Sequence, residues 1–116
     1  MAINRKRKRR IPEKDLRKMI GLIVEAAQPD RIILFGSAAR GDLGPNSDLD
    51  ILVVKRGDYH HVTASQEIYR ALRGIGYAKD IIVVTPEEVE EYGDCPALVI
   101  YPALREGRVI YERPAA

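Results

Sequence analysis

Two aspartates separated by a single residue stand at the start of an aliphatic run. Asp48 and Asp50 precede residues 51–54 in the stretch SDLDILVV. Side chains alternate along a β-strand, so these two carboxylates project from one face while Leu49 projects from the other. Two like charges held this close repel each other unless a cation lies between them, and Mg²⁺ prefers oxygen ligands. The spacing therefore predicts a metal site at the mouth of a buried strand.

A third carboxylate stands in the same relation to another aliphatic run. Asp80 directly precedes the sequence IIVV at residues 81–84. Each aspartate also has an ordinary structural explanation, since Asp48 could cap a turn and Asp50 could lie on an exposed strand face. Three carboxylates at the starts of adjacent apolar strands are harder to explain in this way, because unpaired charges at the end of a sheet weaken it. We therefore favour the metal site.

A glycine-serine turn is expected beside these carboxylates. Gly36 and Ser37 follow the apolar strand expected over residues 31–35, and the segment 36–47 contains three glycines and one proline. This connection is too short for the crossover that parallel strands need, so we predict that the strands at 31–35 and 49–54 are antiparallel. The end of the first strand then lies beside the start of the second.

Two long helices are expected around this strand pair. Apolar residues recur at helical spacing up to Ala27, with Pro12 at the first helical position and Gln28–Pro29 as the stop. A second helix is expected from residue 58 or 59 to residue 73, with Val62, Ile68, Ala71 and Leu72 facing inward. The strand that follows this helix is reached by a parallel crossover, which brings Asp80 beside Asp48 and Asp50.

Shorter elements complete a single α/β (α+β) domain over residues 11–116, with a small mixed sheet of three to four strands flanked by helices. We expect one or two helical turns over residues 37–40 and a helix from the Thr85 capping box to Tyr92. A further helix is expected to start at Pro96 and run through Ile100, with a kink or break at Pro102. An edge strand is expected over residues 108–111.

The composition is that of one small soluble domain. The chain has 116 residues, of which 46% are apolar and 6% aromatic. Its aliphatic runs are far shorter than a membrane span, and no apolar segment follows the basic N-terminus as in a secretory signal, so we expect a cytoplasmic protein. Cys95 is the only cysteine, which excludes an internal disulfide and a cysteine-based zinc site within one chain and favours a buried structural role.

The formal charge of +2 conceals a basic N-terminal arm. Residues 5–10 read RKRKRR and leave 13 basic against 17 acidic residues in the remainder. A block of like charges without apolar residues is expected to be disordered, so we interpret residues 1–10 first as a solvated tail. The alternative is an arm that contacts RNA, nucleotide phosphates or an acidic partner.

The combined pattern resembles a known superfamily. A Gly-Ser turn, an Asp-x-Asp pair ten residues later and a third Asp before a later strand resemble the DNA polymerase beta-like nucleotidyltransferases, which have a palm-like fold. The wording GSAARG followed by SDLDILV, in a short chain, is similar to the minimal nucleotidyltransferases, the antitoxins of HEPN/MNT toxin-antitoxin pairs. The resemblance extends from Ile11 to Tyr111. Gly-Ser alone carries no specificity, whereas the full constellation is fairly specific.

The resemblance implies roles for the acidic residues. Asp48 and Asp50 would bind two Mg²⁺ ions. Asp80 would bind the second ion and help to deprotonate the attacking hydroxyl. The two ions would clamp the incoming oxygen and the leaving pyrophosphate of an in-line displacement.

The resemblance also implies a nucleotide-binding loop for ATP. Gly36 would let the backbone approach the triphosphate, and Ser37 would hold its β and γ oxygens. Arg40 would neutralise phosphate, although an ion pair with Asp42 explains this arginine equally well.

The function that the resemblance implies is transfer of AMP from ATP to a tyrosine of a partner HEPN toxin. Larger relatives add a domain that holds the acceptor, so we expect this short chain to receive its acceptor from a partner. The main alternative is a non-catalytic antitoxin that masks the toxin by binding, with the apolar segment 98–104 as its docking face. A third, more distant reading is nucleotidyl transfer to a small molecule across a homodimer.

Overall fold

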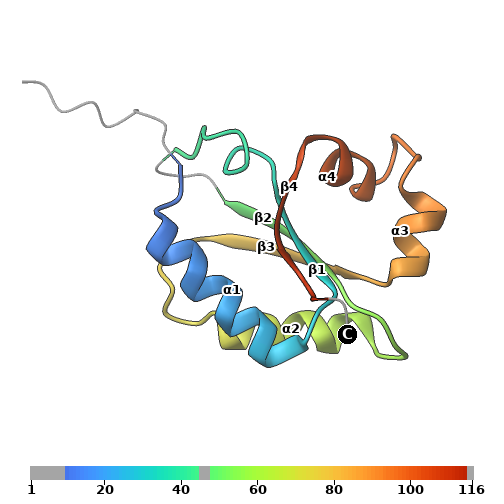
Figure 1. The fold of residues 1–116 in the computed structure, drawn as a ribbon, viewed down its shortest axis with the longest axis horizontal. Helices are drawn as coiled ribbons and strands as arrows, with labels where there is room; N and C mark the ends of the chain where they lie inside the picture. Colours follow the sequence, from blue (N-terminus) through green and yellow to red (C-terminus); the bar gives the residue numbers. More distant parts are fainter. Residues whose placement is uncertain (1–9, 45–47, 115–116) are drawn as a thin grey trace, which may run out of the picture.

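The computed structural model describes residues 10–44 and 48–114, which form one four-stranded sheet with helices on both faces (Figure 1). The predicted mixed sheet of an α/β (α+β) domain is confirmed. The predicted basic arm lies outside the described residues except for Arg10. In chain order the strands are β1 (Arg31–Phe35), β2 (Leu49–Val54), β3 (Lys79–Val84) and β4 (Arg108–Glu112).

The strand order is β3-β2-β1-β4, so the two most apolar strands occupy the centre. β1 and β2 are antiparallel, as the short connection between them predicted, and β2 and β3 are parallel. β4 is the predicted edge strand and pairs antiparallel with β1, with a register shift between Ile32 and Ile33. This arrangement decides which residues share each end of the sheet.

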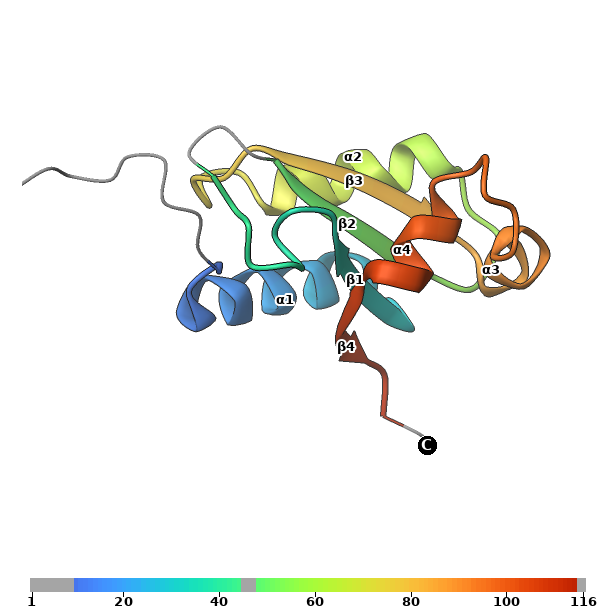
Figure 2. The ribbon, with the colours of Figure 1, turned by 90° about the horizontal axis from the view of Figure 1, so that it is seen from above.

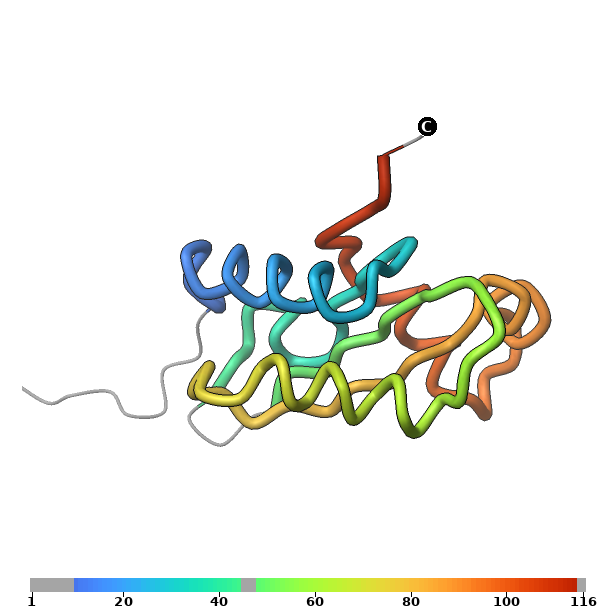
Figure 3. The backbone as a smooth tube through the Cα atoms, turned by 90° about the horizontal axis from the view of Figure 1, so that it is seen from below, coloured from blue at the N-terminus to red at the C-terminus, as the bar shows by residue number. Residues whose placement is uncertain are grey.

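Two helices cover one face of the sheet. α1 (Glu13–Ala27) and α2 (His61–Ala71) lie side by side across it (Figure 3). Their buried side chains, such as Met19 and Ile68, pack against Ile51 and the other strand residues that point to this side. α1 is the longest helix, and no helix within the described ranges is long and apolar enough to cross a membrane.

The other face carries two short helices, α3 (Pro86–Tyr92) and α4 (Ile100–Glu106), and Figure 2 shows α4 on the near side of the sheet. Ile100 and Ala103 of α4 pack on Ile33, Leu52 and Val54. α3 begins at the predicted Thr85 capping box, which is confirmed by both reciprocal hydrogen bonds. A second, smaller core thus lies under α3 and α4.

The helix α2 is shorter than predicted and presents one residue differently. It begins after His60, whose side chain accepts the N–H of Thr63, and it ends at Ala71 rather than residue 73. Val62 was predicted to face inward, but 55% of it is exposed. Val62 lies in the first turn of α2, where its side chain faces solvent. The few apolar residues of this helix do not determine which way its first turn faces.

The prediction for the segment around Pro102 is wrong. Residues 96–99 form turns, and the helix begins only at Ile100. Pro102 is therefore the third residue of α4. A proline there costs no hydrogen bond, because the first N–H groups of a helix have no intrahelical acceptor, and no kink is needed.

Three smaller expectations also need correction. Pro12 was predicted to be the first helical residue of α1, but it is the N-cap, and the helix begins one position later, at Glu13. Cys95 is only partly buried. Residues 37–40 form hydrogen-bonded turns in place of a regular helix, with the N–H of Arg40 3.4 Å from the carbonyl oxygen of Gly36. Two positive-φ glycines, Gly36 and Gly41, bound this turn and stop it from propagating.

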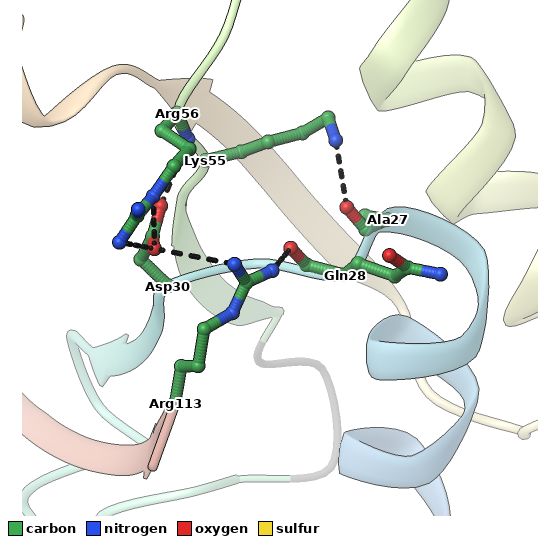
Figure 4. A network of polar contacts seen from close by, with 6 residues as sticks. All are labelled: Ala27, Gln28, Asp30, Lys55, Arg56 and Arg113. Carbon is green, nitrogen blue, oxygen red and sulfur yellow. Dashed lines mark hydrogen bonds and ion pairs between the residues drawn. The ribbon is translucent and has the colours of Figure 1, made fainter. Parts of the chain in front are cut away.

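At the end of the sheet where β1 begins, two arginines surround one aspartate (Figure 4). The carboxylate of Asp30 accepts hydrogen bonds from the backbone N–H of Arg56 at 2.9 Å and from its Nε at 2.8 Å. Arg113, which follows β4, places Nη1 3.8 Å from Asp30 and donates to the carbonyl of Gln28. We call Asp30, Arg56 and Arg113 the arginine end of the sheet.

Candidate active site

Asp50 is held against the glycine turn by strand pairing. It is the second residue of β2 and lies opposite Phe35, the last residue of β1, so the turn that begins at Gly36 is directly beside it. Gly36 has a φ of 71°, and a Cβ atom placed on it would collide with Oδ2 of Asp50. Only glycine combines this backbone conformation with so close an approach.

Asp80 joins Asp50 through the parallel pairing of β2 and β3. The two are register partners, and neighbouring residues in register point their side chains to the same face. Asp48 stands two residues before Asp50 and belongs to that face by alternation. Asp48 and Asp80 are exposed and Asp50 is partly buried. We call these three carboxylates the acidic end of the sheet.

The acidic end is the open part of a face that is otherwise covered. Leu52 and Val54 continue the same face of β2, and Val84 does so on β3. These residues are buried beneath Ile100 and Ala103 of α4. The face therefore passes from an apolar core under α4 to exposed carboxylates at the other end, which is where a charged ligand can approach.

The electrostatics of Asp50 reflect this crowding. Partial burial, together with the charges of Asp80 and Asp48, raises the pKa of Asp50 above its ordinary value of 3.8. Arg40 acts in the opposite direction and lowers it. Ionised Asp50 therefore carries a free-energy cost that a bound cation would relieve.

Ser37 and Arg40 lie in the turn that follows Gly36. The carbonyl of Ser37 accepts the N–H of Asp42 at 2.8 Å. Nε of Arg40 is 3.5 Å from Asp42, and its Nη1 is 3.8 Å from Glu106 of α4. The ion pair with Asp42 that the sequence left open is thus present. About half of the Arg40 side chain is nonetheless exposed, at 51%, and its charge reaches Asp50.

The donor set of the acidic end fits a hard divalent cation such as Mg²⁺. It consists of carboxylate oxygens on one face, and partial burial together with the charges of Asp80 and Asp48 raises the pKa of Asp50, a repulsion that a bound cation would offset. The side chains do not already surround a common point, since the described ranges contain no group of three or more His, Cys, Asp or Glu placed to hold one ion. Binding would therefore need the exposed side chains of Asp48 and Asp80 to reorient.

Tyr69 is a further residue at this site that was not predicted from the sequence. Its hydroxyl accepts the N–H of Ile81 at 2.9 Å and lies 3.5 Å from Oδ1 of Asp80, to which it donates. Tyr69 stands on α2, eleven residues before Asp80. No local pattern marks such a contact, because it forms only when the crossover lays α2 along β3.

In sequence, the chain is similar to a known family and to a curated relative. Residues 17–116 match the family described as polymerase beta, nucleotidyltransferase. The protein adenylyltransferase MntA of Aphanizomenon flos-aquae (strain 2012/KM1/D3) is 27% identical over 85 residues, which cover 72% of this chain. The matched part spans 57% of the length of that relative.

Solved structures share the fold. A toxin-antitoxin complex with AMP-PNP superposes with a TM-score of 0.64 at 17% identity, over 84% of this chain and 73% of that one. An MNT antitoxin in complex with tri-AMPylated Shewanella oneidensis HEPN toxin gives a structure with a TM-score of 0.60 at 16% identity, over 87% and 72% of the two chains. The expected resemblance to the minimal nucleotidyltransferases is confirmed, and the chain belongs to the polymerase beta nucleotidyltransferase family.

Proposed function

We propose that this chain is a Mg²⁺-dependent protein adenylyltransferase that moves AMP from ATP to a tyrosine of a partner HEPN toxin and thereby silences the toxin. The observation that carries this proposal is the register pairing of Asp50 with Asp80 at the open end of the sheet, with Gly36 packed against Asp50. The adenylyltransferase relative supports a protein acceptor, and the complex with an AMPylated HEPN toxin supports the partner.

The turn after Gly36 would bind the triphosphate of ATP. Gly36 lets the main chain approach the phosphates, and Ser37 would donate its hydroxyl to a phosphate oxygen. Arg40 would leave Asp42 and Glu106 for the phosphates. This exchange costs little, because exposed ion pairs such as these contribute only about 0.2–1 kcal/mol each.

The acidic end would serve the displacement at the α-phosphorus. Asp48, Asp50 and Asp80 provide the oxygen ligands, and Mg²⁺, of which we expect two ions, would neutralise the triphosphate and the charge that develops on it. The acceptor hydroxyl oxygen bonds to the α-phosphorus and gives its proton to Asp80. The bond between the α-phosphorus and the bridging oxygen breaks, and pyrophosphate leaves.

The test uses ATP labelled at the α-phosphate, Mg²⁺ and the purified HEPN partner. Wild-type protein should label the partner, and Asp48→Asn should not. Asp58→Asn is the matched control, because Asp58 is an exposed aspartate that follows the far end of β2. An unlabelled partner with wild type, or equal labelling with Asp48→Asn, would contradict the proposal.

The same variants decide whether the chain masks its partner without catalysis. A specific observation favours this second function, because Leu98 and Val99 are each 41% exposed. Ile100 and Ala103 of the expected docking segment are not available, since they are buried against the sheet. If Asp48→Asn still protects cells from the toxin, masking is the main activity. If protection is lost while the variant still binds the partner, catalysis is required.

A further inference from the structure

Asp80 is less enclosed than its register partner Asp50. It lies on β3, which is an edge strand of the sheet, and it is exposed. Asp50, in contrast, is enclosed by Gly36 on one side and by β3 on the other. An exposed aspartate samples several rotamers, and each restriction of that freedom before ligand binding lowers the entropy cost of binding. A group that holds Asp80 therefore affects the whole site.

Tyr69 provides such a group from outside the sheet. Its hydroxyl accepts the backbone N–H of Ile81 at 2.9 Å, which fixes the oxygen atom against the free edge of β3. A hydroxyl has only one proton to donate, and the nearby acceptor is Oδ1 of Asp80 at 3.5 Å. The backbone N–H of Ile81 thus orients the phenol of Tyr69, and this phenol in turn orients the carboxylate of Asp80.

We propose that Tyr69 is a positioning residue that holds Asp80 in place for metal binding and proton transfer, an inference that rests on the proposed function. Packing alone does not explain the residue, since 38% of Tyr69 is exposed and a phenylalanine would fill the same space. Partners that orient a metal ligand from behind typically contribute about 10–100-fold to metal affinity or activity.

The chain offers a matched control for this role. Tyr77 lies in the connection between α2 and β3, and its hydroxyl also donates to an aspartate, Asp15, at 2.6 Å. Asp15 belongs to α1, on the face opposite the acidic end. Tyr77→Phe therefore removes the same chemical group and the same kind of hydrogen bond, but away from Asp80.

The experiment compares Tyr69→Phe with Tyr77→Phe. We expect Tyr69→Phe to lower the affinity for Mn²⁺, measured by electron paramagnetic resonance, by about tenfold, and to lower kcat for AMP transfer with little change in the KM for ATP. Amide exchange at Ile81 should also become faster in this variant alone. Tyr77→Phe should match wild type in Mn²⁺ affinity, kcat and exchange at Ile81, even if it unfolds more easily.

Separate outcomes overturn the two proposals. If Tyr69→Phe binds Mn²⁺ as tightly as wild type, or if Tyr77→Phe loses as much affinity, Tyr69 does not position Asp80, whatever the transfer assay shows. If wild type transfers no AMP but Tyr69→Phe alone weakens Mn²⁺ binding, the positioning role stands and the proposed function fails. A wild-type chain that does not bind Mn²⁺ would overturn both.

Discussion

The two ends of the sheet shift the pKa of an aspartate side chain in opposite directions. At the arginine end, partial burial by itself would raise the pKa of Asp30, but the hydrogen bonds and charge of Arg56 and the charge of Arg113 outweigh it and hold the pKa below 3.8 (Figure 4). At the acidic end, burial and two neighbouring carboxylates raise the pKa of Asp50. Asp30 therefore stabilises the fold, whereas ionised Asp50 lowers its stability. A residue that lowers stability in this way is typical of a functional site.

The most severe test of this contrast is Asp50→Asn. We expect AMP transfer to fall on the order of 1,000-fold, because a principal electrostatic element of the site is removed. The free energy of unfolding at neutral pH should stay the same or rise, since the repulsion from Asp48 and Asp80 is relieved. Urea denaturation beside the transfer assay measures both, and a clear loss of stability would show that Asp50 is structural after all.

Gly36→Ala tests the turn rather than the charge. The added Cβ would collide with Oδ2 of Asp50, and alanine is strained at a φ of 71°. Transfer should fall by about 100-fold, and stability should fall by roughly 1–3 kcal/mol because a non-glycine residue is forced into this conformation. Gly57→Ala is the control, because Gly57 also has a positive φ, 109°, but an added Cβ meets nothing within 4 Å. Equal losses of transfer in both variants would assign the effect to backbone strain alone.

Asp30→Asn should give the reverse of Asp50→Asn. We expect a loss of about 1–3 kcal/mol in the free energy of unfolding, because charge-assisted hydrogen bonds at a side chain only 15% exposed are weakened. Transfer activity of the folded variant should remain within about twofold of wild type, since the site lies at the other end of the sheet. A large loss of activity without loss of stability would break the comparison.

The pH dependence of these two variants sharpens the comparison. A lowered pKa in the folded state means that Asp30 stabilises the fold above pH 3.8, and this contribution is lost as the pH falls through the folded pKa. A raised pKa means that ionised Asp50 costs stability above its folded pKa, and this cost disappears as the pH falls towards 3.8. As the pH falls, the difference from wild type should therefore disappear between the raised folded pKa and pH 3.8 for Asp50→Asn, and only below pH 3.8 for Asp30→Asn.

The smallest expected effect lies at neither end of the sheet. Gly21 is exposed in the middle of α1, and an added Cβ would meet nothing within 4 Å. Gly21→Ala should raise the free energy of unfolding by about 0.5–1 kcal/mol through helix propensity and leave transfer unchanged. A change in activity in this variant would show that stability and activity are coupled throughout the domain, which would weaken the interpretation of the other variants.

Much of the strand framework was predictable, and the reasons are local. Continuous apolar runs bounded by glycine, proline or aspartate gave the bounds of β1 and β2, and the short connection gave their antiparallel direction. The orientation of Val62 and the start of α4 were not predictable in this way. The orientation of Val62 and the start of α4 both depend on which other segments pack against the helix. The residues of the helix alone do not specify this packing.

The sequence by itself determined that Asp48 and Asp50 share a face, because alternation along a strand is a property of the backbone. Only the tertiary structure decided that Asp50 is in register with Asp80, that Tyr69 reaches Asp80 around the edge of β3, and that Arg113 reaches the beginning of β1. Such contacts join distant segments, and their geometry is set by strand register and helix packing, which no local stretch of sequence specifies.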